Sequence, residues 1–251
     1  MRAAASIVTV RNLSVAFPDR SAGGVRALEQ VSFEVKPYEF VAVIGPSGCG
    51  KSTLLRVLAG LHAPTSGEVR FEGNQHPRVG MVFQDANLMP WRTVLQNIML
   101  PLELARRADA AQRARELIEL VGLKGFEHKW PYQLSGGMAH RVAIARALIH
   151  DPDLALLDEP FAALDALTRE RMGMELSRIW QAHRKTVVMV THSINEAIFL
   201  ADRVIVLTER PGNLKLDMKV DLPRPRRVEM YYDARFVEMA RRLRSEIGSS
   251  W

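Results

Sequence analysis

The nine residues Gly45–Thr53, which read GPSGCGKST, constrain this chain more than any other segment. They match G-x-x-x-x-G-K-[ST], the pattern of a phosphate-binding loop. The apolar run 40–44 before them predicts a buried strand, and the leucines and valines spaced over 54–61 predict a helix after them. A chance glycine-rich turn is the alternative, but the strand and helix on either side disfavour it. We therefore expect the chain to bind a nucleoside triphosphate.

Each residue type in this phosphate loop has a chemical role. Glycines let the backbone curve so that N–H groups point inward, and the helix N-terminus adds partial positive charge. Lys51 is expected to reach the outer phosphates, and Ser52 to place its hydroxyl on Mg²⁺. At the mouth of a helix, Cys49 is expected to have a lowered thiol pKa and to be shielded by ATP. The other predicted nucleotide contacts here are Gly45, Pro46, Ser47, Gly48, Gly50 and Thr53.

Length and composition are those of an ordinary globular protein. The 251 residues are 47% hydrophobic and 25% charged, enough for one large domain or two small ones. No apolar run approaches the length that spans a bilayer. The single cysteine excludes an internal disulfide and is typical of a reducing cytosol. Residues 209–251 have ten Lys or Arg against seven Asp or Glu and so carry +3 of the net charge of +6. This excess indicates a solvated surface or, as the alternative, a membrane-proximal one.

The hydrophobic pattern changes twice along the chain. Alternating segments near the N-terminus and the run 79–83 predict strands, whereas helical spacing prevails from 85 to 151. Strand–helix alternation then resumes up to 207, which predicts a parallel sheet covered on both faces. We therefore predict an α/β fold in one domain, 1–251. It is divided into a nucleotide-binding core (1–84 and 152–209), a helical subdomain (85–151) and a C-terminal tail (210–251) with a strand and a last helix around 234–247.

Polar side chains follow two of the predicted parallel strands. Asp158 and Glu159 end the run 154–157, where a parallel sheet binds its ligands. Asp158 is expected to help hold Mg²⁺, and Glu159 to orient or deprotonate the attacking water. His192 follows the strand 186–190 and is either a contact to the γ-phosphate or a surface residue. The remaining histidines, His140 among them, are expected on the surface.

The segment Leu134–Met138, with sequence LSGGM, opens a predicted helix. Ser135 is a good N-cap, and Gly136 and Gly137 expose backbone N–H groups. The segment is therefore a second candidate anion site, although a plain helix cap has the same pattern.

Taken together, the order of these motifs resembles the ATPase subunit of ABC transporters over essentially the whole chain. The resemblance implies a P-loop NTPase (RecA-like) core with an N-terminal antiparallel β subdomain and an inserted helical subdomain. It implies that Phe17 stacks on adenine and that Gln84 contacts Mg²⁺ and senses the γ-phosphate. It further implies Glu159 as catalytic base, Asp165 at a subunit contact and His192 as the γ-phosphate switch.

The resemblance also implies that two copies form a head-to-tail homodimer. Ser135, Gly136 and Gly137 of one copy would close over ATP held by the phosphate loop of the other. Met138 and His140 depart from the glutamines common at or near these positions, and neither change removes a backbone donor.

Further segments narrow the resemblance to the nitrate, sulfonate and taurine importer branch. They are the Pro90-Trp91 pair, the region 161–169 and the region 220–226. This branch implies ATP and Mg²⁺ as cofactors and a peripheral place at the cytoplasmic face of the inner membrane. The implied partners are two membrane permease subunits, contacted through the region from Gln84 to Trp91, and indirectly a solute-binding protein. The alternative for this loop is packing on its own lobe.

Two other functions compete with transport. An ABC-type ATPase acting on nucleic acid or the ribosome generally has two ATPase cores, coiled-coil insertions or zinc-binding cysteines, and this sequence has none of them. No nucleic-acid partner is therefore expected. A phosphate-transferring kinase would leave Leu134–Met138 and His192 unexplained.

Overall fold

A computed structural model of the chain describes residues 7–18, 24–72, 77–162 and 164–248. The chain divides into two compact units, residues 1–77 with 185–251 and residues 78–184. In the described part of the chain, no helix is both long and apolar enough to cross a membrane.

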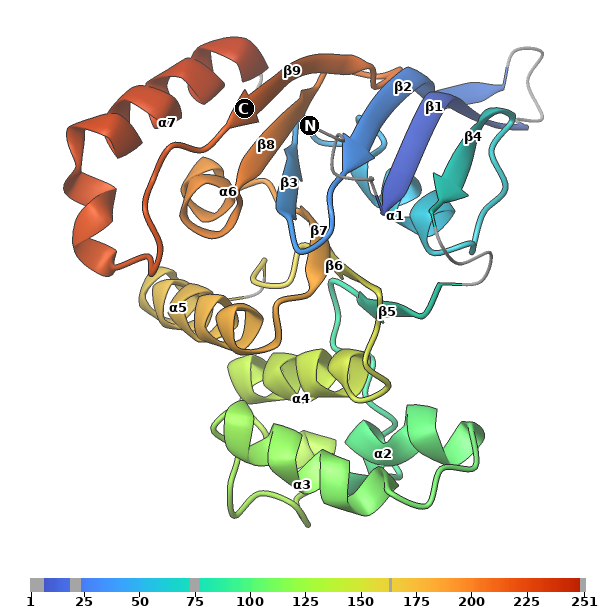
Figure 1. The fold of residues 1–251 in the computed structure, drawn as a ribbon, viewed down its shortest axis with the longest axis vertical. Helices are drawn as coiled ribbons and strands as arrows, with labels where there is room; N and C mark the ends of the chain where they lie inside the picture. The colour runs from blue at the N-terminus through green and yellow to red at the C-terminus, as the bar shows by residue number, and fades with distance from the viewer. Residues whose placement is uncertain (1–6, 19–23, 73–76, 163, 249–251) are drawn as a thin grey trace. The chain divides into compact units, whose positions relative to one another are not determined.

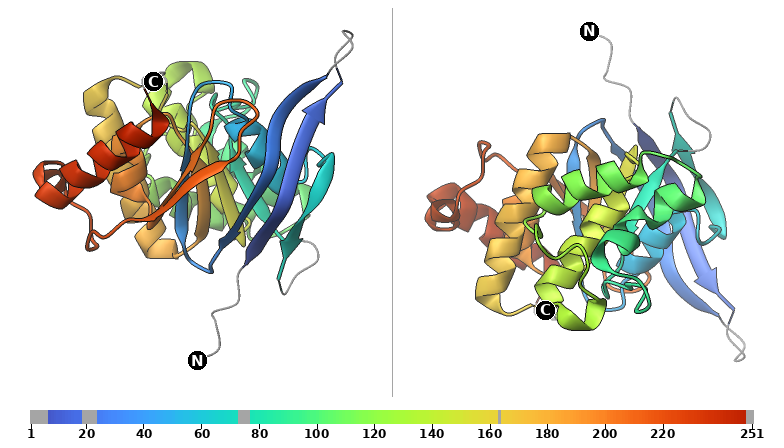
Figure 2. Two further views of the ribbon diagram at one scale, coloured as in Figure 1. Left: turned by 90° about the horizontal axis from the view of Figure 1, so that it is seen from above. Right: turned by 90° about the horizontal axis from the view of Figure 1, so that it is seen from below.

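The first unit contains an antiparallel sheet in the order β2-β1-β4. Its strands are β1 (Val8–Phe17), β2 (Val25–Val35) and β4 (Ser66–Phe71). They lie next to one another as one twisted sheet in both views of Figure 2. Buried and exposed residues largely alternate along β2, because successive side chains of a strand point to opposite faces. The expected N-terminal antiparallel subdomain is therefore present.

The same unit contains the parallel strands that carry the phosphate loop. β3 (Phe40–Ile44) pairs in parallel with both β7 (Thr186–Val190) and β8 (Arg203–Leu207), and β9 (Leu214–Lys219) runs antiparallel to β8. Every residue of β3 and β7 is buried, as expected for strands covered on both faces. The helix α1 (Lys51–Leu58) contacts β7, and α6 (Ile194–Leu200) contacts β3. The predicted α/β fold with a parallel core is confirmed.

The second unit combines a parallel strand pair with four helices. β5 (Val79–Val82) pairs with β6 (Leu154–Asp158). The helices are α2 (Val94–Leu104), α3 (Ala110–Leu120), α4 (Gly136–Leu148) and α5 (Ala166–His183), with a short 3-10 helix, η1 (Pro131–Gln133). Figure 1 shows α2, α3 and α4 packed together, and apolar residues of all three form one buried cluster with Ile179 of α5. The predicted helical segment 85–151 lies within this unit, and its role as a separate subdomain stays a prediction.

The tail after residue 209 is part of the first unit and packs against α6. Besides β9 it has the 3-10 helix η2 (Val228–Tyr232) and the helix α7 (Ala234–Ile247), whose predicted bounds are confirmed. Asp233 caps α7 by accepting a hydrogen bond from Arg235 N at 2.8 Å. Phe236 packs edge-on to Tyr231, which stacks on Phe199 of α6 with ring centroids 5.0 Å apart. The tail is thus attached to α6 through aromatic contacts.

Two arginines of the tail bind the C-terminal end of α6. Arg226 is buried, and its guanidinium donates to Ile198 O at 2.7 Å and to Ala201 O at 3.3 Å. Arg224 donates to Leu200 O and to the Asp202 carboxylate. These carbonyls belong to the last turn of α6 and the residue after it, where backbone acceptors lack partners within the helix. Burial lowers the pKa of Arg226 to about 10, so the guanidinium stays charged at neutral pH.

We expect Arg226→Ala to lower the free energy of unfolding by about 2 kcal/mol, because it leaves buried carbonyls without donors. Urea denaturation followed by circular dichroism measures this change. Arg227→Ala is the matched control, since Arg227 is the next residue and is exposed. Equal stability of the two variants would contradict the proposed importance of the contact.

Candidate nucleotide site

The phosphate loop connects the end of β3 to the start of α1. Two of its glycines have left-handed backbone conformations, with φ 75° at Gly48 and φ 99° at Gly50. A Cβ on Gly50 would also lie 2.7 Å from Ala27 O, so a larger residue would displace backbone as well as strain φ. The glycine spacing of the motif is therefore required by the turn itself.

The Lys51 side chain is folded back over this loop. It is 7% exposed, and its Nζ donates to Gly45 O at 2.6 Å and to Pro46 O at 2.9 Å. The ammonium group is thus held beside the turn whose N–H groups are expected to receive phosphate. Ser52 follows as the second residue of α1 and is half-buried.

The prediction for the Cys49 thiol was wrong. The residue is fully buried, and this burial raises the thiol pKa. Lys51, whose Nζ is 3.8 Å from Cys49 Sγ, lowers the pKa but by less than burial raises it. The sequence indicated the nearby helix N-terminus but not the enclosure of the sulfur, and enclosure disfavours the charged thiolate.

Gly212 supports the phosphate loop and was not found from the sequence. Its N–H donates to Ala27 O at 2.9 Å, and its carbonyl accepts from Glu29 N at 2.9 Å. A Cβ at this position would lie 2.1 Å from Cys49 O. The tail backbone therefore packs directly against the loop. In the sequence the only signal was a Pro-Gly pair, which predicts a turn and nothing more.

The parallel register places His192 at the same sheet edge as the phosphate loop. Val190 of β7 pairs with Val43 of β3, and Thr191 N donates to Val43 O at 3.2 Å. His192 and Gly45 each follow two residues later, and His192 is exposed. Its neighbour Thr191 is buried and donates to the Glu196 carboxylate at 2.5 Å. Thr191 and Glu196, which sequence reasoning missed, fix the backbone next to His192.

Phe17, the predicted adenine contact, lies at the end of β1. Its side chain is 36% exposed, and its ring centroid is 4.9 Å from that of His62. An exposed aromatic ring of this kind offers a surface on which a flat base can stack.

The predicted acidic pair ends a buried strand of the second unit. Asp158 is the last residue of β6 and is buried, whereas Glu159 is half-buried. Glu159 has φ 46°, a left-handed conformation that is uncommon for residues other than glycine. Such backbone strain is often found at functional sites.

The residues Ser135–Gly137, hereafter the signature turn, begin α4. Ser135 Oγ accepts from Met138 N at 3.3 Å, while Ser135 and Gly136 are exposed. A Cβ on Gly137 would lie 3.6 Å from the Thr168 side chain of α5. Thr168 N in turn donates to Asp165 at 3.0 Å, and this hydrogen bond lowers the pKa of that carboxyl. The signature turn and Asp165, both predicted subunit contacts, are therefore close together.

His140 contradicts its predicted surface position. The residue is buried in α4, with ring nitrogens 3.0 Å from Gly136 O and 2.9 Å from Gln84 O. No local pattern indicates this burial, because Gln84, which contacts the ring, is distant along the chain. The Gln84 side chain itself is exposed.

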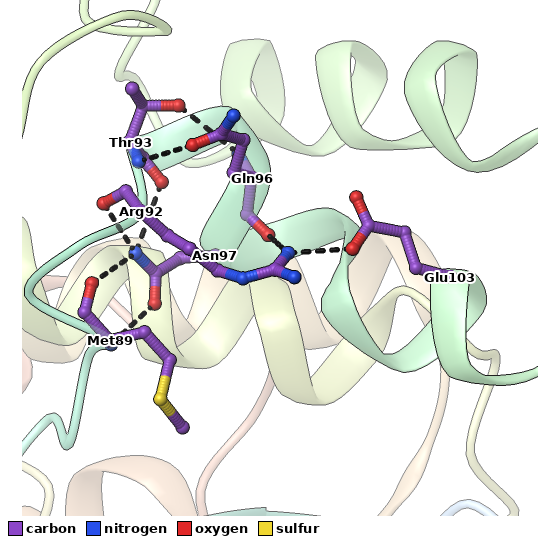
Figure 3. A network of polar contacts seen from close by, with 6 residues as sticks. All are labelled: Met89, Arg92, Thr93, Gln96, Asn97 and Glu103. Carbon is purple, nitrogen blue, oxygen red and sulfur yellow. Dashed lines mark hydrogen bonds and ion pairs between the residues drawn. The ribbon is translucent and has the colours of Figure 1, made fainter.

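The loop after Gln84 is held by one buried amide (Figure 3). Asn97 of α2 accepts from Met89 N at 2.8 Å, and its Nδ2 lies within hydrogen-bond distance of Met89 O, Arg92 O and Thr93 O. Thr93 and Gln96 form a capping box at the start of the same helix. The loop therefore has a fixed conformation, although its Trp91 side chain is exposed.

An open pocket of about 700 Å³ lies within the second unit beside this loop. Arg146 forms part of its wall and donates to Ala86 O and Asn87 O, both at 2.8 Å. Burial lowers the pKa of this guanidinium. The other lining residues come from β5, the loop, α2 and α4 and are Arg78, Val79, Gly80, Met81, Phe83, Asn87, Met89, Leu100, Pro101, Leu104, Ala105, Ala147 and His150.

Comparison with known proteins identifies the family. A family model described as ABC transporter matches residues 28–162, more than half of the chain. This chain belongs to the ABC transporter family. An aliphatic sulfonates import ATP-binding protein of Mesorhizobium japonicum is 50% identical over 82% of this chain and 81% of its own. A nitrate import ATP-binding protein of Synechococcus elongatus is 47% identical over 87% of this chain and 36% of its own.

A solved structure agrees with this assignment. It is a dimeric ATP-binding cassette in a post-hydrolysis state, bound to ADP and Pi. It is 34% identical to this chain, with a TM-score of 0.75, and covers 86% of this chain and 100% of its own. The predicted ABC ATPase of the nitrate, sulfonate and taurine branch is confirmed, and the chain is an ATPase. The roles of single site residues stay predictions.

The raised pKa of Cys49 predicts slow alkylation of the folded chain by N-ethylmaleimide at pH 7, because the reactive thiolate is scarce below the thiol pKa. The rate is expected to be at least about tenfold lower than in the urea-unfolded chain and to rise as the pH increases. Mass spectrometry follows the reaction, with Cys49→Ser as the blank. A folded chain that reacts as fast as the unfolded one would contradict burial of the thiol.

Proposed function

We propose that this ABC ATPase drives an importer of a small solute, such as a sulfonate, taurine or nitrate. The observation that carries the nucleotide part is the phosphate loop with Lys51 folded over it, at the same sheet edge as His192. The sulfonate and nitrate import proteins among the relatives support the class of solute. In such systems a binding protein and membrane subunits select the solute.

In this proposal the phosphate loop binds the ATP phosphates through its backbone N–H groups. Lys51 exchanges its loop carbonyls for the outer phosphates, and Phe17 stacks on the adenine. Residues 45–53 thus form the main nucleotide contact, and His192 hydrogen-bonds the γ-phosphate.

The family resemblance assigns Mg²⁺ to three oxygen-bearing side chains. They are the Ser52 hydroxyl, the Gln84 amide oxygen and the Asp158 carboxylate, and oxygen is the donor that Mg²⁺ prefers. The buried position of Asp158 at a strand end fits a carboxylate that faces a ligand. A bound Mg²⁺ would neutralise phosphate charge during transfer.

Glu159 acts as the base in this proposal. It orients and deprotonates the water that attacks the γ-phosphorus, and the proton moves to its carboxylate. As the new P–O bond forms, the bond from the γ-phosphorus to the bridging oxygen breaks, and ADP leaves with that oxygen. The left-handed backbone of Glu159 aims the residue differently from an ordinary strand end.

Two copies complete each other's sites. The exposed N–H groups of the signature turn bind the γ-phosphate held by the partner's phosphate loop, and Asp165 lies at the same subunit contact. ATP binding closes this head-to-tail dimer, and hydrolysis reopens it.

The permease contact is assigned to the loop from Gln84 to Trp91 and the adjoining pocket. Asn97 fixes the loop, so its exposed Trp91 is presented without further ordering cost. The pocket adds the exposed Leu104 and the guanidinium of Arg146. Two copies of the chain would hold two permease subunits at the cytoplasmic face of the inner membrane, and a solute-binding protein would act through them. Co-purification of membrane proteins, and not nucleic acid, distinguishes this function from the alternative ATPase classes.

Glu159→Gln is expected to lower ATP turnover by at least about a hundredfold while ATP still binds, because the base is lost and the binding groups are not. Phosphate release and nucleotide retention after gel filtration measure the two effects. Glu170→Gln, an exposed acid on α5, serves as the control. Normal hydrolysis by Glu159→Gln would exclude this residue as the base.

Leu104→Asp is expected to abolish permease binding and leave the turnover of the isolated chain unchanged. Leu104 is 78% exposed and lines the pocket, so a charge there disrupts an apolar contact without disturbing the core. Val237→Asp, on α7 and 47% exposed, is the control. Co-purification from membranes gives the readout, and undiminished recovery of permease with Leu104→Asp would reject this contact.

A further inference from the structure

His140 connects two segments of the chain, because it contacts Gln84, which lies 56 residues earlier. It lies in the second turn of α4 and is 4% exposed. One ring nitrogen, Nδ1, is 3.0 Å from Gly136 O in the first turn of the same helix. The other, Nε2, is 2.9 Å from Gln84 O, just after β5. The ring therefore lies between the backbone of Gln84 and the backbone of the signature turn.

Both neighbours of the ring are acceptors. A carbonyl oxygen cannot donate, so each contact is a hydrogen bond only when the facing nitrogen carries a proton. A proton on Nε2 allows a hydrogen bond from α4 to Gln84 O. A proton on Nδ1 allows only a bond to Gly136 O, within the same helix. Because the helix backbone does not supply a donor to Gln84 O, the contact at 2.9 Å favours a proton on Nε2.

The contact from His140 to Gln84 joins two segments that have different roles in ATP binding. This step rests on the proposed function. In that function Gln84 senses the ATP bound by its own copy, whereas the signature turn binds the ATP held by the partner. A side chain that fixes one backbone to the other therefore connects the two ATP sites of the dimer.

We propose that His140 is a positioning residue that couples the two ATP sites, through an Nε2–H hydrogen bond to the Gln84 carbonyl. Movement of the Gln84 segment when ATP binds is transmitted to the signature turn, which contacts the second ATP. The expected consequence is positive cooperativity in ATP, with a Hill coefficient above 1 and at most the number of sites.

Two substitutions distinguish the effect of this hydrogen bond from the effect of side-chain packing. In His140→Gln the amide is long enough to donate to the Gln84 carbonyl. In His140→Ser the hydroxyl is expected to bond the Gly136 carbonyl four residues earlier in the helix and to leave Gln84 unbound. His128→Ser is the matched control, because His128 is exposed in the same unit.

The test measures steady-state turnover against ATP concentration for the full chain and its variants, with ATP affinity measured separately on the Glu159→Gln background. We expect His140→Ser to lower the Hill coefficient to about 1 and to change ATP affinity by less than about twofold. His140→Gln and His128→Ser should retain the cooperativity. A cooperative His140→Ser variant, or equal losses in both His140 variants, would overturn the proposal.

A measurement on the unsubstituted chain tests the same bond if His140→Ser does not fold. Long-range ¹H–¹⁵N spectra assign which ring nitrogen is protonated, and the proposal requires a proton on Nε2 of His140. An unprotonated Nε2 would overturn it. Non-cooperative turnover by the unsubstituted chain would also overturn it while leaving the proposed ATPase intact, whereas absence of turnover would count against the proposed function itself.

Discussion

The parallel pairing of β3 with β7 is the constraint on which the nucleotide-binding part of this molecule depends. Both strands are buried throughout, so their backbone groups must bond to one another and their register is fixed. Because Val43 is paired with Val190, the phosphate loop and His192 leave the sheet at one edge. Groups from distant parts of the sequence are thereby brought to one edge of the sheet by backbone pairing.

The loops at this edge are stabilised by contacts that carry no catalytic chemistry. Gly212 packs against the backbone of Cys49, and Thr191 bonds to Glu196 beside His192. In the second unit Asn97 holds the loop that follows Gln84. Each of these residues orders backbone in advance, which lowers the entropy lost when a ligand or partner binds. Several buried polar contacts of this ATPase therefore serve to hold loops in place.

Sequence reasoning succeeded where a local pattern determines the structure. The loop at Gly45–Thr53, its flanking strand and helix, and the helix at 234–247 follow from spacing over a few residues. It failed for Cys49 and His140, because both are enclosed by residues distant in sequence and enclosure has no periodic signal. Gly212 was missed for the same reason. The family resemblance supplied roles for site residues, but it gave no indication of the contacts that hold them in position.

The central claim is that each ATP site is built from two copies of the chain. Its most direct test mixes two inactive variants, Lys51→Ala in the phosphate loop and Ser135→Arg in the signature turn. Random pairing leaves one intact site in each heterodimer, so the mixture should recover up to about a quarter of unsubstituted turnover while each variant alone stays inactive. Ser135→Arg alone hydrolysing ATP at the unsubstituted rate would contradict the account.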